Sequence, residues 1–250
     1  MKFNAACVQL TSVNNIAANI EKVSILIAEA VARKADFITL PENVFFMDGD
    51  HGNFSSRVFL DGEHPGVKAV RKLAEEYARY ILIGSLNVDS GDGKAFNRSI
   101  LVGPEGRVIA QYDKIHLFDV ELKNGEKYRE SERITGGGKM SLAELPWGVL
   151  GLSICYDIRF GYLYREMALA GASFFAVPAA FTVPTGQAHW HVLLRARAIE
   201  NGAYVFAPAQ WGEHPGKRRT YGHTLIVNPW GEVIAELPEG EGVIVAEVDT

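Results

Sequence analysis

The stretch that decides the fold is VGPEGRVIA at Val102–Ala110, because nearly the same pattern returns as VNPWGEVIA at Val227–Ala235. From Val102 to Val227 is 125 positions, half of the 250-residue chain. Each copy places Pro and Gly between alternating strands, which is typical of a β-hairpin. Such hairpins are common, so the similarity is either chance or an internal two-fold repeat. A repeat predicts two sheets packed face to face, each with helices outside it.

Hydrophobic periodicity around these hairpins predicts alternating helices and strands. Apolar residues recur at helical spacing over Ile16–Val31 and Val67–Tyr77, and short apolar runs follow at Ala35–Pro41 and Ile81–Gly84. The second half repeats the alternation in these segments: Leu150–Ile154, Tyr162–Ala170, Phe174–Val177, His191–Ile199 and Tyr204–Ala207. No linker separates the halves, so the sequence predicts an α/β fold in a single domain over residues 1–250.

The composition excludes several classes of protein. It is 48% hydrophobic and 22% charged, which argues against disordered and fibrous chains. The net charge is −5 and the longest basic run is Lys217–Arg219, so neither nucleic acid nor an anionic membrane is expected as a partner. No segment approaches the roughly 20 consecutive apolar residues that span a bilayer, and the first residues do not resemble a secretory signal. We therefore expect a cytoplasmic protein.

Several familiar catalytic and metal-binding motifs are absent from the sequence. It contains no G-x-S-x-G, no H-E-x-x-H and no G-x-x-x-x-G-K-[ST], which argues against a serine-hydrolase elbow, a zincin helix and a nucleotide-binding loop. His189 and His191 are two positions apart and point in different directions on a helix, so no metal site is expected there. Cys7 and Cys155 are too distant in sequence to form a C-x-x-C pair.

Cys155 is the candidate nucleophile. In GLSICYDIR, at Gly151–Arg159, an apolar strand leads into a polar turn ahead of a helix. A turn of this kind presents a side chain at the end of a sheet, with outward-pointing backbone N–H groups just after it. Cys7 lies inside an apolar strand and is expected to be a buried structural thiol. For Cys155, a buried structural thiol is the alternative to a nucleophile.

A thiol nucleophile needs a base and a cation beside it. Moving a proton from a thiol with a pKa near 8.5 to a carboxyl with a pKa near 4.3 costs about 6 kcal/mol. A working site is therefore expected to raise the carboxyl pKa by desolvation and to favour the thiolate with a cation. Glu42 and Lys114 are the candidates, since both follow apolar strands, where α/β sites are usually built. Taken singly, each is more often a solvated surface charge.

Together these segments resemble a known family. LPEN at 40–43, YDKIHLF at 112–118 and CYDIRF at 155–160 resemble, in order and spacing, the Glu, Lys and Cys motifs of the nitrilase superfamily of carbon–nitrogen hydrolases. The resemblance spans almost the whole chain. It implies an α/β fold that is a four-layer αββα sandwich built from two pseudo-two-fold related halves.

The resemblance also implies a role for each candidate residue. Cys155 would be the nucleophile and Glu42 the general base, and Lys114 would stabilise the tetrahedral intermediate. The second glutamate of the family, which positions the first, corresponds to Glu130. The implied reaction passes through a thioester and uses no metal and no cofactor.

Other segments narrow the implied substrate. AAFT at 179–182 and YGH at 221–223 look most like the deaminated glutathione amidase branch and next most like the omega-amidases. Tyr156-Asp157 stands where true nitrilases carry Trp-Glu, which favours amides over nitriles. The resemblance therefore implies hydrolysis of a small linear amide to a carboxylate and ammonia, by an enzyme that is at least a homodimer.

Four further residues are expected to contact the substrate. The Tyr156 amide would complete the oxyanion hole, Arg159 would hold a substrate carboxylate, and Phe181 and Thr182 would line the pocket. An ion pair of Arg159 with a neighbouring acid, Asp157 or Glu166, is an equal alternative. Gly161-Tyr162 replaces the Pro-Glu that is common in the family, which alters the rim of the pocket.

Three alternatives remain open from the sequence. One is a nitrile or N-carbamoyl hydrolase of the same superfamily. The second is a Cys-His thiol acyltransferase or peptidase that uses His116 or His223 as its base. The third is a binding module or scaffold with the same fold. The two acids and the cation expected around one thiol argue against this third alternative, because a scaffold has no use for them.

Overall fold

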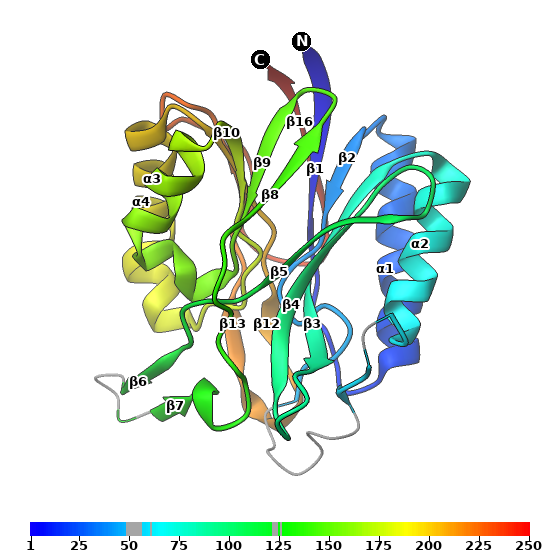
Figure 1. Ribbon diagram of the computed structural model, residues 1–250, viewed down its shortest axis with the longest axis vertical. Coiled ribbons are helices and arrows are strands. Elements are labelled where there is room, and N and C mark those ends of the chain that lie inside the picture. Colours follow the sequence, from blue (N-terminus) through cyan, green and yellow to red (C-terminus); the bar gives the residue numbers. More distant parts are fainter. Residues whose placement is uncertain (49–56, 61, 122–124, 126) are drawn as a thin grey trace.

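The computed structural model describes residues 1–48, 57–60, 62–121, 125 and 127–250. Two β-sheets lie face to face in the middle of the molecule (Figure 1). One is covered by α1 (Ile16–Ala32) and α2 (Pro65–Tyr77), the other by α3 (Gly161–Leu169) and α4 (Val183–Asn201). This helix–sheet–sheet–helix order confirms the predicted αββα sandwich. Within the described ranges, no helix has the length and apolar character needed to cross a membrane.

The two sheets have the same pattern of parallel and antiparallel strands. The first is β16-β1-β2-β3-β4-β5, and the second, taken from its β8 edge, is β8-β9-β10-β11-β14-β15. In both, three central parallel strands have an antiparallel strand on one side and an antiparallel hairpin on the other. The first sheet contains β1 Lys2–Gln9, β2 Phe37–Thr39, β3 Tyr80–Asp89, β4 Ala95–Val102, β5 Val108–Asp113 and β16 Gly242–Asp249. The second contains β8 Ser141–Leu145, β9 Gly148–Leu152, β10 Ala172–Ala176, β11 Tyr204–Ala207, β14 Thr224–Val227 and β15 Val233–Leu237.

The β4–β5 and β14–β15 hairpins are equivalent in detail. The N–H groups of Gly106 and Gly231 each donate to the carbonyl three residues earlier at 2.9 Å, with φ angles of 70° and 82°. A helix arginine closes each turn, because Arg71 Nε donates to the Gly106 carbonyl and Arg195 Nε to the Gly231 carbonyl, both at 2.7 Å. Chance similarity does not produce matching long-range contacts, so the two-fold repeat predicted from the sequence is confirmed.

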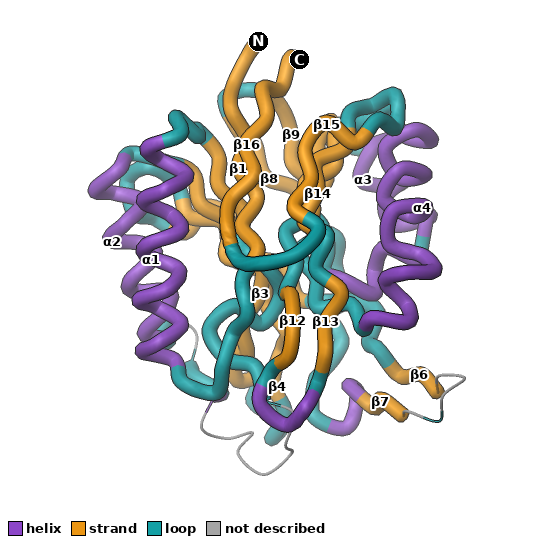
Figure 2. Tube along the Cα trace, turned by 180° about the vertical axis from the view of Figure 1, so that it is seen from behind, coloured by secondary structure: helices purple, strands orange, loops and turns teal. Residues whose placement is uncertain are grey.

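Aromatic side chains fill the space between the sheets. The rings of Phe37 on β2 and Phe206 on β11 lie 5.6 Å apart between centroids, and those of Phe3 on β1 and Phe174 on β10 lie 5.5 Å apart. These pairs join facing strands of opposite sheets, so the halves share a hydrophobic core. Since β1 and β16 are antiparallel neighbours, the N- and C-termini lie side by side (Figure 2).

The helices largely match the sequence prediction, with one exception. The predicted Ile16–Val31 helix is α1, whose first turn is capped by the Asn15 side chain. By contrast, α4 begins at Val183 rather than at His191. Pro184 is compatible with the first turn because that position needs no intrahelical N–H bond. Two short two-stranded sheets are separate from the main sheets. One pairs β6 Asp119–Glu121 with β7 Lys127–Arg129, and the other pairs β12 Trp211–Glu213 with β13 Arg219–Tyr221.

Candidate active site

The three central candidates each follow the carboxyl end of a strand. Glu42 comes after β2, Lys114 after β5 and Cys155 after β9. The two sheets face each other, so these strand ends meet from opposite halves of the molecule at one edge of the sandwich. Residues more than 100 positions apart in sequence thereby line the same cavity.

Cys155 occupies a strained turn that is held from several sides. Its φ of 51° lies in the left-handed region, and its N–H donates to the Pro178 carbonyl at 2.9 Å. The buried Asp157 fixes the turn, since one of its oxygens accepts from the Ile154 N–H at 2.9 Å and from the Tyr112 hydroxyl at 2.7 Å. The turn is therefore tied to the other sheet through Tyr112 at the end of β5.

Two carboxylates accept hydrogen bonds both from the ammonium of Lys114 and from the side-chain amide of Asn97. Lys114 Nζ donates to Glu42 Oε1 at 2.9 Å and to Glu130 Oε2 at 2.9 Å. Asn97 Nδ2 donates to Glu42 Oε1 at 2.9 Å and to Glu130 Oε1 at 3.1 Å. The Phe118 N–H donates to Glu130 Oε2 at 2.7 Å. Glu42, only 3% exposed, is therefore fixed by donors from two strands of its own sheet.

The charges of this cluster follow from burial and from its neighbours. Burial tends to raise the pKa of Glu42, but the Lys114 ammonium and a hydrogen bond with Cys155 outweigh it and lower that pKa below its usual value. Burial tends to lower the pKa of Lys114, but Glu130 and Glu42 hold it well above its usual value. Burial and the Glu42 carboxylate raise the pKa of the Cys155 thiol.

The resting site therefore pairs a thiol with a carboxylate and an ammonium. This corrects the expectation that desolvation raises the pKa of the carboxyl base, because the ammonium lies directly against Glu42. The base is ionised, whereas the thiol from which it must take a proton has a raised pKa. Proton transfer is unfavourable before substrate is attacked, so it must be coupled to that attack.

The remaining cysteine and histidine candidates lie elsewhere. Cys7 is fully buried on β1, and burial raises its pKa to about 12, as expected for a structural thiol. His116 Nδ1 lies 2.7 Å from Asp157 Oδ1, and His223 Nδ1 lies 2.7 Å from Glu236 Oε1. Neither histidine lines the cavity that contains Cys155. The Cys-His alternative from the sequence is therefore not supported by the geometry.

A cavity of about 700 Å³ opens above the cluster. Its lining contains all four predicted catalytic side chains, Glu42, Lys114, Glu130 and Cys155. Three of the four predicted substrate contacts, Tyr156, Phe181 and Thr182, line it as well. The cavity is thus enclosed by both halves of the chain.

Arg159 is the exception among the predicted contacts. It is not part of the cavity lining; its guanidinium lies over the rings of Tyr156 and Phe181, at 5.5 and 5.6 Å from their centroids. Its Nη2 lies 3.2 Å from His189 Nδ1. Arg159 therefore packs against two aromatic residues of the pocket wall, and no ion pair joins it to Asp157 or Glu166, the two acids proposed as its partners.

The sequence analysis did not single out most of the lining, including an amide side chain and several arginines. Asn97 lies on β4, in a strand whose pattern is ordinary. Arg57, Arg133 and Arg218 are among the five arginines of the lining, which also contains Asp48 and Glu132. Burial and then the charges of Arg133 and Arg218 lower the pKa of Arg57 to about 10. No motif marks these arginines, since they come from connecting segments between strands and helices.

The candidate metal-binding group of the described residues lies away from the cavity. Across the described part of the chain, the group of three His, Cys, Asp or Glu side chains close enough to hold a metal ion is His191, His223 and Glu236. None of the three lines the cavity. The candidate active site thus consists of an acid pair, a cation and a thiol.

Comparison with known proteins places the chain in a family. The family model described as carbon-nitrogen hydrolase matches residues 4–250. A deaminated glutathione amidase of Synechocystis sp. is 40% identical over 249 residues, covering 98% of this chain and 91% of its own. The omega-amidase NIT2 of Danio rerio is 33% identical over 250 residues, covering 99% and 88%.

A solved structure supports the same family as the family model and the two relatives. Saccharomyces cerevisiae Nit3, described as a member of branch 10 of the nitrilase superfamily, superposes with a TM-score of 0.89 at 30% identity and covers 99% of this chain and 90% of its own. The chain belongs to the carbon-nitrogen hydrolase family of the nitrilase superfamily. It is a hydrolase that acts on carbon–nitrogen bonds, as the sequence resemblance implied.

Proposed function

We propose that the protein is a cysteine-dependent amidase that converts a small linear amide to a carboxylate and ammonia through a thioester on Cys155. The observation that carries this proposal is the contact of one buried ammonium, that of Lys114, with the carboxylates of Glu42 and Glu130 in the cavity that contains Cys155. A scaffold or binding module gains nothing from burying two acids and a cation around one thiol.

In the first half of the reaction, the sulfur of Cys155 attacks the carbonyl carbon of the amide while Glu42 takes the thiol proton. The negative charge moves to the carbonyl oxygen, where the Lys114 ammonium and the Tyr156 N–H stabilise it. The C–N bond then breaks, and Glu42 returns the proton to the nitrogen so that ammonia leaves. The products of this half are a thioester and free ammonia.

In the second half, Glu42 takes a proton from water, which attacks the thioester carbonyl. The C–S bond breaks, the sulfur recovers a proton from Glu42, and the carboxylic acid that is released gives its own proton to solvent. Glu130 acts as a positioning residue, because it holds Lys114 and Asn97 against Glu42. No step requires a metal or a cofactor.

The arginines of the cavity define the substrate class. Arg218 Nη2 donates to the Ala180 carbonyl at 3.1 Å. Burial tends to raise the pKa of Glu42, and the Arg218 charge helps to lower it, although less than Lys114 and Cys155 do. A guanidinium group pairs well with a carboxylate, and Arg57, Arg133 and Arg218 all line the cavity. We infer that the amide carries carboxylate groups, as an omega-amide or a deaminated glutathione-like amide does.

Ammonia release from a panel of compounds tests this proposal. We expect turnover of carboxylated linear amides and none of nitriles or N-carbamoyl compounds; activity confined to either of the latter would reassign the reaction. In Arg218→Gln, the ratio of kcat/KM for a carboxylated amide to that for a neutral amide should fall by about 10-fold or more. Arg159→Gln, the matched control, should change this ratio less.

The assembly and cellular location also remain proposals. Tyr162 and Leu169 on α3 and Val192 and Ile199 on α4 are exposed apolar residues on the outer helix layer, and a second copy of the chain would cover them. We propose a homodimer, which light scattering of the purified protein would test. A cytoplasmic location is the expectation from the sequence, and fractionation of the producing cells would test it.

A further inference from the structure

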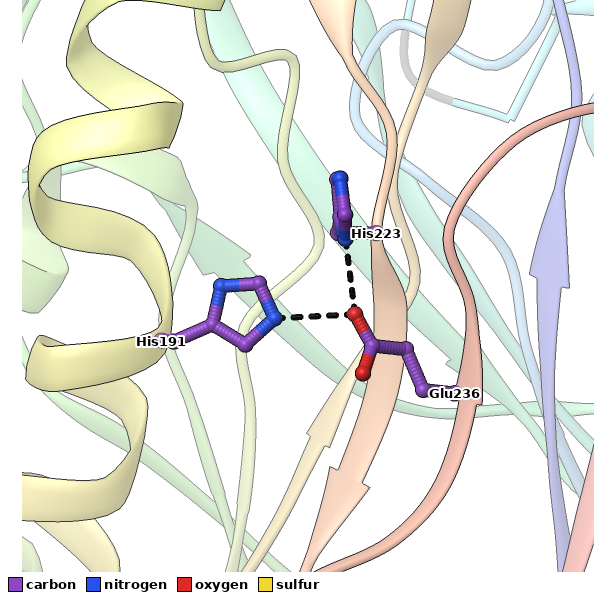
Figure 3. A group of neighbouring side chains, drawn as sticks. All are labelled: His191, His223 and Glu236. Carbon is purple, nitrogen blue, oxygen red and sulfur yellow. Dashed lines mark hydrogen bonds and ion pairs between the residues drawn. The ribbon is translucent and has the colours of Figure 1, made fainter.

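Two histidines and a glutamate converge on the outer side of the second sheet (Figure 3). His191 comes from α4, His223 from the connection between β13 and β14, and Glu236 from β15. Glu236 Oε1 lies 2.8 Å from His191 Nε2 and 2.7 Å from His223 Nδ1, so both rings point at one carboxylate oxygen. The possible ligand atoms all lie within 4.8 Å of one another.

The backbone fixes these side chains before any ion binds. His223 has a φ of 54°, its N–H donates to the Pro238 carbonyl at 3.1 Å, and its carbonyl accepts from Trp190 Nε1 at 2.9 Å. Its ring stacks on Tyr221 at 4.1 Å between centroids. Trp190, the residue before His191, thus ties the helix to the turn that holds His223.

The donor set suits a first-row transition metal. Two imidazole nitrogens and a carboxylate oxygen are a common three-ligand set for Zn²⁺, which keeps its fourth position for water. Ligand atoms of a tetrahedral zinc site are about 3.3 Å apart, given bonds of about 2.0–2.2 Å. Both N···O distances of 2.7–2.8 Å would therefore open by about 0.5 Å on binding, which side-chain rotation allows.

The site is also accessible. The side chains of His191, His223 and Glu236 are 33%, 23% and 28% exposed. In a single copy of the chain, an ion can therefore enter from solvent, and a water molecule can fill the position that the protein leaves open.

We propose that His191, His223 and Glu236 form a binding site for a divalent transition-metal ion, Zn²⁺ by preference, that clamps α4 to the second sheet. On binding, the two ring nitrogens that face Glu236 give up their protons, either to the other ring nitrogen or to solvent. The metal thereby replaces two N–H···O bonds with three coordinate bonds. This site is independent of the proposed amidase chemistry, since none of its residues lines the cavity.

Equilibrium dialysis against Zn²⁺ tests the proposal, with untagged protein carrying Cys155→Ser so that the active-site thiol does not bind the metal. The expected result is one zinc per chain. At a Zn²⁺ concentration about 100 times the dissociation constant, Tm should rise by about 5–10 °C. No bound zinc, or binding without a rise in Tm, overturns the proposal.

Three variants in the same background identify the ligands. His191→Ala and Glu236→Gln should each weaken zinc binding by about 100-fold and remove the Tm rise. His189→Ala, the matched control, removes an imidazole from the same helix and should leave binding unchanged. Tm measured without metal shows whether each variant folds. Retention of full zinc binding by folded His191→Ala or Glu236→Gln protein refutes the assignment, as does anomalous scattering that places zinc elsewhere.

Discussion

Asn97→Ala removes a positioning residue that no sequence motif marks. Its Nδ2 donates to Glu42 at 2.9 Å and to Glu130 at 3.1 Å. A hydrogen bond to a charged group contributes about 1.5–3 kcal/mol, and each 1.4 kcal/mol or so corresponds to about tenfold in rate. Losing the bond to Glu42 should therefore lower kcat by about 10- to 150-fold, with a smaller effect on KM.

The pH profile separates this role from a structural one. The Asn97 donor stabilises the ionised form of Glu42, so its removal raises the pKa of Glu42, and the acidic limb of kcat/KM moves to higher pH. Steady-state ammonia release across a pH series measures both quantities. Ser99→Ala is the matched control, because Ser99 is buried on the same strand and donates to the Ile83 carbonyl instead. An unshifted acidic limb with unchanged kcat in Asn97→Ala would refute the positioning role.

Three other perturbations follow from the same geometry. Because burial and Glu42 raise the pKa of Cys155, its alkylation by iodoacetamide should be slow at neutral pH and keep rising beyond pH 8.5 or so, while Cys7 stays unmodified; a plateau below neutrality would contradict this. Lys114→Met leaves buried carboxylates unpaired and should lower the free energy of unfolding at pH 7 by about 3–5 kcal/mol. The Glu42 pKa is lowered in the folded protein, so this group stabilises the fold above its unfolded pKa of about 4.3 and less as the pH falls. The deficit of Lys114→Met in urea unfolding should therefore shrink towards pH 4 or so, and a constant deficit would count against the pairing. Finally, Glu42→Gln should reduce kcat by about 10²- to 10⁴-fold while His223→Ala changes it little, and the reverse ranking would restore a histidine base.

Strand ends made three residues of the site candidates in the sequence, and the resemblance of their motifs to a known family then singled them out together. Glu42, Lys114 and Cys155 each follow a short apolar run, and the carboxyl ends of such strands meet at one edge of an α/β fold. The repeated hairpin was equally informative, because its Gly106 and Gly231 turns require positive φ and recur half a chain apart. Periodicity and turn chemistry are local properties that a sequence displays directly.

Properties that depend on tertiary neighbours were not predictable in the same way. Asn97 alternates with its strand neighbours like any inward-facing residue, and only the fold brings it to two carboxylates. Arg159 is close to Cys155 in sequence, but it is not part of the cavity lining and its guanidinium lies over the rings of Tyr156 and Phe181. The sign of the Glu42 pKa shift depends on how closely Lys114 approaches, a distance that sequence spacing does not set.

Mass spectrometry of the acyl-enzyme tests the central claim most directly. Protein quenched with acid during turnover of a carboxylated amide should carry an added mass equal to the amide minus ammonia, on the peptide that contains Cys155. Glu130→Gln, in which the water step is slowed, should accumulate more of this adduct, and Cys155→Ala should show neither adduct nor ammonia release. Ammonia release by Cys155→Ala at the native rate, or an acyl group on another residue, would contradict the account.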